Sequence, residues 1–338
     1  MGSSSDYNDA AKAMRSLLSA QPETQDLIRY ATLAPNGHNT QPWLFSLAPD
    51  HIIVRPDFSR RTPVVDPDDH HLFVSLGCAA ENLAIASAAR GHSGELSFDD
   101  ANDASINFAY HDAAPAGSVL FDAIPLRQST RADYDGREVS SADLKTLAAA
   151  AAIPGIDMVL ITDRPRMDRI RDLVVAGNSA QMGDPAFLRE LKSWLRFSPR
   201  QALQSGDGLF TAASGNPSLP QWLGPRAFDM FVTAKSENDK YAGQLRSSAG
   251  VAVFAGSEDS RAYWTLAGRA CQRFALQATA LGLKHAFINQ PVEVVALRPE
   301  LAALVGTPGR RPDIVMRFGY GPSLPYSVRR PINTVIAV

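Results

Sequence analysis

The sequence of 338 residues has few of the features that would tie a protein to nucleic acid, a membrane or an oxidising compartment. It has only two cysteines, Cys78 and Cys271. Both lie in apolar helical patterns, so we expect buried reduced thiols of a cytoplasmic protein. The net charge of −2 provides no bulk attraction to nucleic acid or to an acidic membrane. No uninterrupted apolar run of about 18 residues occurs, and we expect neither a membrane span nor a signal peptide.

Several catalytic motifs are also missing. The sequence has no G-x-S-x-G, H-E-x-x-H, C-x-x-C or G-x-G-x-x-G, which argues against a serine hydrolase, a zincin, a dithiol enzyme and a Rossmann dehydrogenase. His70 and His71 follow an acidic run. Adjacent residues of a helix point about 100° apart, however, and no Cys or i+4 His completes a set of ligands. We therefore expect no metal site.

Hydrophobic periodicity predicts the helices and strands. Residues 1–7 are expected to be a loose polar tail, and the run at 66–71 to start a helix with Asp68 or Asp69 near its positive end. The helix at 72–90 is apolar on nearly every side, which is typical of a buried helix. The other predicted helices are 8–19, 22–34, 142–152, 164–178, 186–197, 259–281 and 298–305. The predicted strands are 43–47, 52–55, 95–98, 105–110, 157–162 and 250–255, one within 282–288, and 313–318.

The pattern breaks down at 198–224, where Gly and Pro recur and apolar residues such as Phe210 and Trp222 are interspersed. A loop of this length in a compact protein is either a lid or disordered. The apolar residues favour a lid that packs on the rest of the protein.

The two long apolar helices can be aligned at an offset of 191 residues, which places Gly77 on Gly268 and Gly91 on Gly282. Each helix is followed by a predicted strand. This correspondence suggests an internal duplication, with the two helices paired in the middle as in a two-fold dimer.

The segment 124–135 contains Arg127, Ser129 and Arg131 at alternate positions. Alternate side chains of an extended segment point the same way, so two guanidiniums and a hydroxyl could converge on one anion such as a phosphate. A solvated basic turn fits the same string equally well.

Several stretches together resemble the FMN-dependent nitroreductase family, over residues 22–338. They are the segment 34–43 (A-P-N-G-H-N-T-Q-P-W), R-x-S-x-R at 127–131, the two Gly- and Ala-rich helices, P-V-E at 291–293 and the closing F-G-Y-G-P with R-R-P. The size and the split motifs are similar to the Acg-like branch, in which one chain contains both halves. The resemblance implies an α+β fold with mixed or antiparallel sheets flanked by helices and two pseudo-symmetric halves. We expect a tail at 1–21 and halves at 22–120 and 121–338.

The resemblance also implies the cofactor site. Arg127, Ser129 and Arg131 would hold the FMN phosphate, with Arg329 or Arg330 as a further basic partner. The segment with Pro35, Asn36, Gly37, Asn39 and Gln41 would approach the ribityl chain and the ring, and the backbone of Pro291 and Glu293 would lie near flavin N5. Alternatively, Asn39 and Gln41 cap the turn and Glu293 is a surface carboxylate. The family usually has Ser where this chain has Asn36 and Gly37, which puts hydroxyl contacts there in doubt. Because the first half lacks a clamp, one FMN per chain is expected.

The implied activity is ping-pong hydride transfer from NAD(P)H through the flavin to a small aromatic or quinone-type acceptor, with no catalytic side chain required. The sequence does not distinguish NADH from NADPH. The alternative is a protein that sequesters FMN beneath a closed lid, with Trp222 and Phe210 in the acceptor position. Expected partners are small molecules, without nucleic acid or membrane. The protein is expected to be a monomer, as a pseudo-dimer, or a homodimer.

Overall fold

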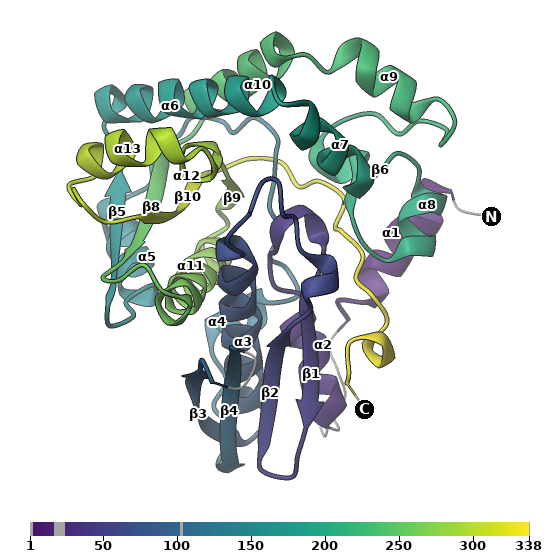
Figure 1. The fold of residues 1–338 in the computed structure, drawn as a ribbon. Coiled ribbons are helices and arrows are strands. Elements are labelled where there is room, and N and C mark those ends of the chain that lie inside the picture. Colours follow the sequence, from purple (N-terminus) through teal and green to yellow (C-terminus); the bar gives the residue numbers. More distant parts are fainter. Residues whose placement is uncertain (1–2, 17–23, 102–103, 338) are drawn as a thin grey trace.

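The computed structural model describes residues 3–16, 24–101 and 104–337, and two four-stranded antiparallel sheets form its framework (Figure 1). The first sheet has the order β1-β2-β4-β3 and the second the order β5-β8-β10-β9. The strands of the first sheet are β1 (Trp43–Leu47), β2 (His51–Pro56), β3 (His92–Asp99) and β4 (Ser105–Asp112). Those of the second are β5 (Ile156–Ile161), β8 (Gly250–Gly256), β9 (Lys284–Phe287) and β10 (Pro312–Gly319). All eight predicted strands are therefore confirmed, as is the α+β class.

Each sheet has one long helix between its second and third strands along the chain. These helices are α3 (His70–Ala89) and α11 (Arg261–Ala280), and they pack side by side in the middle of the molecule (Figure 1). A Cβ on Gly77 would lie 2.0 Å from the carbonyl oxygen of Thr265, and a Cβ on Gly268 would lie 2.0 Å from that of Val74. The offset of 191 residues relates these two contacts to each other, so the crossing is two-fold in sequence as well as in space.

Further helices cover the sheets. Between the sheet β5-β8-β10-β9 and its covering helices lies a second apolar cluster that includes Ile170, Val174, Val251 and Val315. The helices are α1 (Ser4–Ala13), α2 (Thr24–Thr32), α4 (Val119–Ala123), α5 (Ser141–Ala150), α6 (Arg164–Met182), α7 (Pro185–Trp194), α8 (Pro199–Ser205), α9 (Gly224–Phe231), α10 (Ala234–Arg246), α12 (Gln290–Glu293) and α13 (Arg298–Leu304). Helices α9 and α10 were not predicted from the sequence.

Two isolated bridges join the sheets to segments distant in sequence. Near the C-terminus, Ile336 forms a parallel bridge with Phe45 of β1, and Ser129 forms one with His285 of β9 (Figure 1). Each sheet is thereby extended by residues distant in sequence.

Two of three local predictions were wrong. The chain start is helical from Ser4, because the Ser3 side chain accepts the Asp6 backbone N–H in a capping box. The predicted helix beyond residue 16 and the start of the next at 22 lie outside the described residues. Asp69 precedes the first residue of α3, as expected for an acidic residue near the positive end of the helix, but the carboxylate that accepts the N–H groups of His71 and Leu72, at 3.0 Å each, is that of Asp66. Residues 198–224 are not a plain loop but include α8, the short strand β7 (Leu209–Phe210), which pairs with β6 (Leu195–Arg196), and a 3₁₀ turn.

Helix α3 is long and apolar enough to cross a membrane by length and composition, but 78% of the window that passes this test is buried inside the protein. Its apolar surface is explained by packing against α11, β2 and β4, as expected for a core helix.

Candidate functional site

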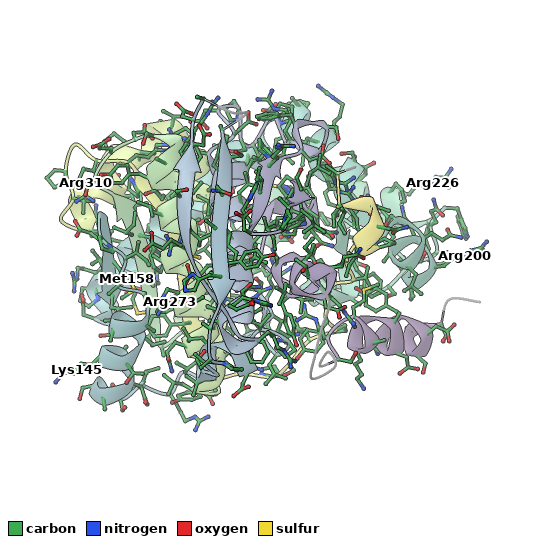
Figure 2. The ribbon with its side chains drawn as sticks, turned by 90° about the horizontal axis from the view of Figure 1, so that it is seen from below. Lys145, Met158, Arg200, Arg226, Arg273 and Arg310 are labelled. Atoms are coloured by element: carbon green, nitrogen blue, oxygen red, sulfur yellow. The ribbon has the colours of Figure 1, made fainter. Side chains whose placement is uncertain are left out.

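A cavity of about 570 Å³ lies where the two halves of the chain meet, beneath the segment 195–232. The first half contributes residues 35–38 and one face of α3, with Val74, Ser75 and Cys78. The second half contributes the end of α6 together with Asn289, Gln290 and Glu293. The roof, residues 195–232, contributes mostly apolar side chains: Leu195, Phe197, Leu209, Leu219, Ala227, Phe228, Phe231 and Val232. Arg200 and Arg226 of this roof point outward into solvent (Figure 2).

The loop at the start of the first sheet forms one wall and is held in a strained conformation. His38, Asn39 and Gln41 have positive φ angles of 47°, 55° and 55°. The Asn36 carboxamide oxygen accepts the Gln41 N–H at 2.8 Å. Asn39 donates to the carbonyls of Gly208 and Val328, and Gln41 donates to that of Gly206 at 2.9 Å. Asn39 and Gln41 therefore tie this loop to the roof and to the C-terminal segment, and neither lines the cavity, whereas Pro35, Asn36 and Gly37 do.

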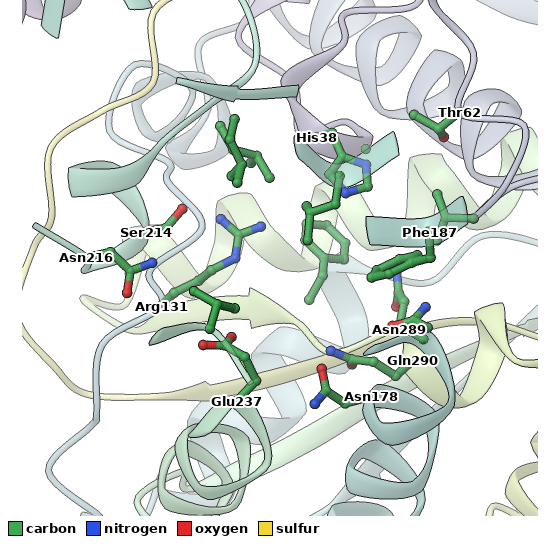
Figure 3. A pocket seen from close by; sticks show the side chains of 18 of the residues that line it. His38, Thr62, Arg131, Asn178, Phe187, Ser214, Asn216, Glu237, Asn289 and Gln290 are labelled. Carbon is green, nitrogen blue, oxygen red and sulfur yellow. The ribbon is translucent and has the colours of Figure 1, made fainter. Parts of the chain in front are cut away.

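Arg131 is the member of the R-x-S-x-R segment that reaches the cavity. Figure 3 shows its guanidinium pointing inward near Ser214, Asn216 and Glu237, with His38 and Thr62 on the opposite side. Lys240 lines the same end and contacts the Asn216 carboxamide oxygen at 3.4 Å. Within the part of the chain that the structure describes, the Arg131 guanidinium has no hydrogen bond or ion pair. A cation without a partner in a cavity is suited to an anionic ligand.

Arg127 and Ser129 do not accompany Arg131. Arg127 is 2% exposed, does not line the cavity and donates to the Leu33 carbonyl at 2.9 Å, while its Nε and Nη1 have no partner. Ser129 bridges to His285 at the sheet edge. Of the three side chains at alternate positions, only that of Arg131 is among the described residues that line the cavity, so the three do not converge there. Arg127 is therefore buried away from the cavity, and its contact with a cofactor stays a prediction.

Arg329 and Arg330 contact the residues that form and flank the 35–38 wall of the cavity. The buried Arg329 guanidinium donates to the carbonyls of Thr32, Leu33 and Ala34, which end α2 and precede the 35–38 wall. It also donates to the Asn39 carboxamide oxygen at 2.9 Å. The Arg330 backbone N–H donates to the Gln41 side chain at 2.8 Å, and its guanidinium lies 3.6 Å from Asp57. Neither arginine lines the cavity.

Glu293 lines the cavity through its side chain. Its backbone N–H is donated to the Asn289 carbonyl within the turn of α12, and Pro291 is buried but is not part of the lining. One carboxylate oxygen accepts from Gln181 Nε2 at 2.5 Å, and the other lies 3.7 Å from His71 Nε2. Burial raises the pKa of Glu293 and lowers that of His71 to about 3. The alternative of a surface carboxylate was therefore wrong.

Four amide side chains along the second-half wall were missed: Asn178, Gln181, Asn289 and Gln290 (Figure 3). Asn178 and Gln181 are three residues apart, which places them on one face of α6. Gly177 lets α6 approach α12, because a Cβ there would lie 2.8 Å from Gln290. Polar residues at i and i+3 on the buried face of an amphipathic helix are the signal that could have identified the first pair.

The two aromatic residues that were expected to occupy the acceptor position, Phe210 and Trp222, do not reach the cavity. Phe210 packs on Tyr7 with ring centroids 4.3 Å apart, and Trp222 is 70% exposed. Neither lines the cavity, so the expectation that they occupy the acceptor position was wrong. Phe197, Phe228 and Phe231 form the aromatic part of the roof instead.

No family model matches the chain, but it is similar to several known proteins. A candidate NAD(P)H nitroreductase of Mycobacterium tuberculosis is 30% identical over 323 residues, which cover 92% of this chain and 90% of that protein. A second protein of the same organism, the candidate nitroreductase acg, is 27% identical over 326 residues, with 92% and 94% coverage. The crystal structure of a candidate nitroreductase from Anabaena variabilis matches with a TM-score of 0.52 at 12% identity, over 93% of this chain and 91% of that one.

Proposed function

The chain belongs to the NAD(P)H nitroreductase family, and from this premise we propose that its cavity holds FMN and that the protein is an FMN-dependent NAD(P)H oxidoreductase acting on a small aromatic or quinone-type acceptor. The observation that carries the proposal is the unpaired Arg131 guanidinium at one end of a large cavity with apolar and amide walls. A volume of about 570 Å³ is in the range of cofactor sites.

The donors in the cavity fit the chemistry of a phosphorylated flavin. Arg131 and Lys240 supply positive charge at one end for a phosphate, and Ser214 lies beside them. Amide side chains on the opposite wall can pair with the polar edge of a flavin ring. Among these, the Gln290 carboxamide oxygen is buried without a hydrogen-bond partner, and so is His38 Nδ1 on the loop wall. Such groups are costly unless a ligand or water satisfies them.

When bound, FMN supplies the chemistry of accepting a hydride from NAD(P)H and delivering the electrons to an acceptor. The chain's residues bind, orient and shield it. Arg131 and Lys240 would neutralise the phosphate, the 35–37 loop and Glu293 would lie along the cofactor, and Phe197 and Phe228 would exclude water from above.

Seven further residues are proposed to act on the site in different ways. Asn39, Gln41, Arg329 and Arg330 would hold the loop wall in its strained form, because their hydrogen bonds converge on residues 32–41. For Arg127, Ser129 and Pro291 we propose a supporting role behind the cavity. We also propose that the two sheets arose by duplication and form a pseudo-dimer, with one FMN per chain.

The roof favours a second candidate function, FMN sequestration. Residues 195–232 cover the cavity with apolar side chains, and the carbonyls of Gly206 and Gly208 accept hydrogen bonds from Gln41 and Asn39. A cover that is fixed in this way would suit a protein that stores FMN. Steady-state turnover distinguishes the two functions. Reduction and reoxidation at rates of order 1 per second, typical of enzymes, would exclude sequestration as the main role.

The first test is the absorbance spectrum of the purified protein and identification of the flavin released on heating. The second is Arg131→Met, which removes a charge-assisted contact worth about 1.5–3 kcal/mol and should weaken FMN binding by about 10- to 100-fold in a fluorescence titration. Arg137→Met is the matched control, because Arg137 is an exposed arginine of the same segment, paired with Asp135 at 2.8 Å. Equal losses in both variants, or a protein that binds no FMN, would contradict the proposal.

A further inference from the structure

Glu293 is a largely buried carboxyl group that lines the cavity, and it has no Lys or Arg partner among the described residues. Its side chain is 20% exposed, and among the described residues its polar contacts are the Gln181 amide at 2.5 Å and the His71 ring at 3.7 Å. Buried carboxylates in proteins are normally paired with Lys or Arg. A carboxyl group that lacks such a pair is best accommodated in its protonated form.

The groups around Glu293 and His71 favour the neutral form of both side chains. Asp66 also lines the cavity; burial raises its pKa to about 6, and after burial its charge further raises the pKa of Glu293. Burial, together with the charges of His70 and Arg311, lowers the pKa of His71 to about 3 against the opposing effects of Glu293 and Asp68. The imidazole is therefore neutral at neutral pH.

The backbone explains why the carboxyl group is held in place. The Asp66 carboxylate fixes the first turn of α3 by accepting the His71 and Leu72 N–H groups, and this sets the direction of His71. On the other side, the Glu293 N–H is donated to Asn289, which closes the α12 turn and leaves the side chain directed at Gln181. Three elements thus converge on one carboxyl group at the cavity wall.

We propose that Glu293 is a catalytic acid that donates a proton to the acceptor, with Gln181 and His71 as positioning residues. This inference rests on the proposed oxidoreductase function.

The step balances for a quinone acceptor. Reduction to the hydroquinone takes two electrons and two protons, and a hydride that originates from NAD(P)H carries both electrons and one proton. The Glu293 O–H bond breaks and an O–H bond forms on the acceptor oxygen, which supplies the second proton. The carboxylate that remains accepts the Gln181 N–H and recovers its proton from water.

Glu293→Gln tests the step, because glutamine keeps the shape of the side chain but cannot donate an acidic proton. The turnover number with a small quinone should fall by about 100-fold, within the usual range for loss of a general acid. Turnover with ferricyanide, an acceptor that takes electrons without a proton, should fall much less than quinone turnover in the same variant. Glu300→Gln is the matched control, because Glu300 is an exposed carboxylate of α13 paired with Arg169.

A measurement independent of turnover uses the unmodified protein. The infrared spectrum at neutral pH should contain the C=O stretching band of a protonated carboxyl group that disappears in Glu293→Gln. Gln181→Leu should shift the quinone pH profile so that activity is lost at a higher pH, because a hydrogen bond to the carboxylate form lowers the pKa of Glu293 and this variant removes it.

Three outcomes would overturn the inference: an equal fall in quinone and ferricyanide rates, no fall in either, or no infrared band attributable to Glu293. A protein that binds no flavin or reduces neither acceptor would instead overturn the proposed function, so the two failures are distinguishable.

Discussion

Replacing Gly268 with alanine should destabilise the protein by separating α3 from α11. The added Cβ would lie 2.0 Å from the Val74 carbonyl oxygen and 3.1 Å from the Cys78 backbone nitrogen, whereas ordinary contact begins at 3.4 Å. These neighbours are backbone atoms of a helix, so no side chain can rotate away. The helices would have to move apart by roughly 1 Å, which forfeits much of the dispersion energy of their close approach.

The expected size follows from two opposing terms. Overpacking in a core costs about 1–3 kcal/mol, and more where backbone must shift. Alanine in a helix interior recovers about 0.5–1 kcal/mol relative to glycine. The net loss should be about 1–2 kcal/mol or larger, and Gly77→Ala should behave alike because its Cβ would meet Thr265 at the same 2.0 Å.

The assay is thermal unfolding followed by circular dichroism, together with the FMN content, since Val74 and Cys78 line the cavity. Gly243→Ala in α10 is the matched control. The nearest atom to its new Cβ is 3.9 Å away, so this change should stabilise the protein by about 0.5–1 kcal/mol. The reasoning would be refuted if Gly268→Ala and Gly243→Ala raised the unfolding midpoint alike.

Two further predictions concern buried polar side chains. His285→Leu should remove a pH dependence of the free energy of unfolding. Burial lowers the pKa of His285, and neither ring nitrogen has a hydrogen-bond partner among the described residues, so the histidine stays neutral in the folded state but binds a proton below about pH 6.5 in the unfolded state. Between pH 7.5 and 5 the wild type should therefore lose about 2 kcal/mol of stability relative to the variant, as measured by urea unfolding. Parallel curves would contradict this. Gln41→Leu should leave the Gly206 carbonyl and the Arg330 N–H unpaired, at about 1–3 kcal/mol, and should speed tryptic cleavage of the roof. The exposed Gln204→Leu is its control, and equal cleavage rates would count against the tether.

Much of the fold was predictable because its signals are local. Ile52 and Val54 alternate with less buried residues in β2, so the strand is visible in the sequence alone. The wholly apolar surface of α3 predicted burial, and glycines at matching positions predicted close helix packing. The roof was less predictable, since its short helix α8 depends on a Ser198 cap and on packing against α1 rather than on a strong periodicity.

The candidate site shows most clearly which features the sequence determines and which depend on the tertiary structure. The amino-acid sequence, through its resemblance to the nitroreductase family, identified Pro35, Asn36, Gly37, Arg131 and Glu293, all of which line one cavity. Only the tertiary structure decided that Arg127 is buried against the Leu33 carbonyl while Arg131, four residues later, is free in the cavity. The reason is physical: residue type and spacing fix which groups a segment carries, but the direction of each side chain is fixed by the distant backbone on which the segment packs.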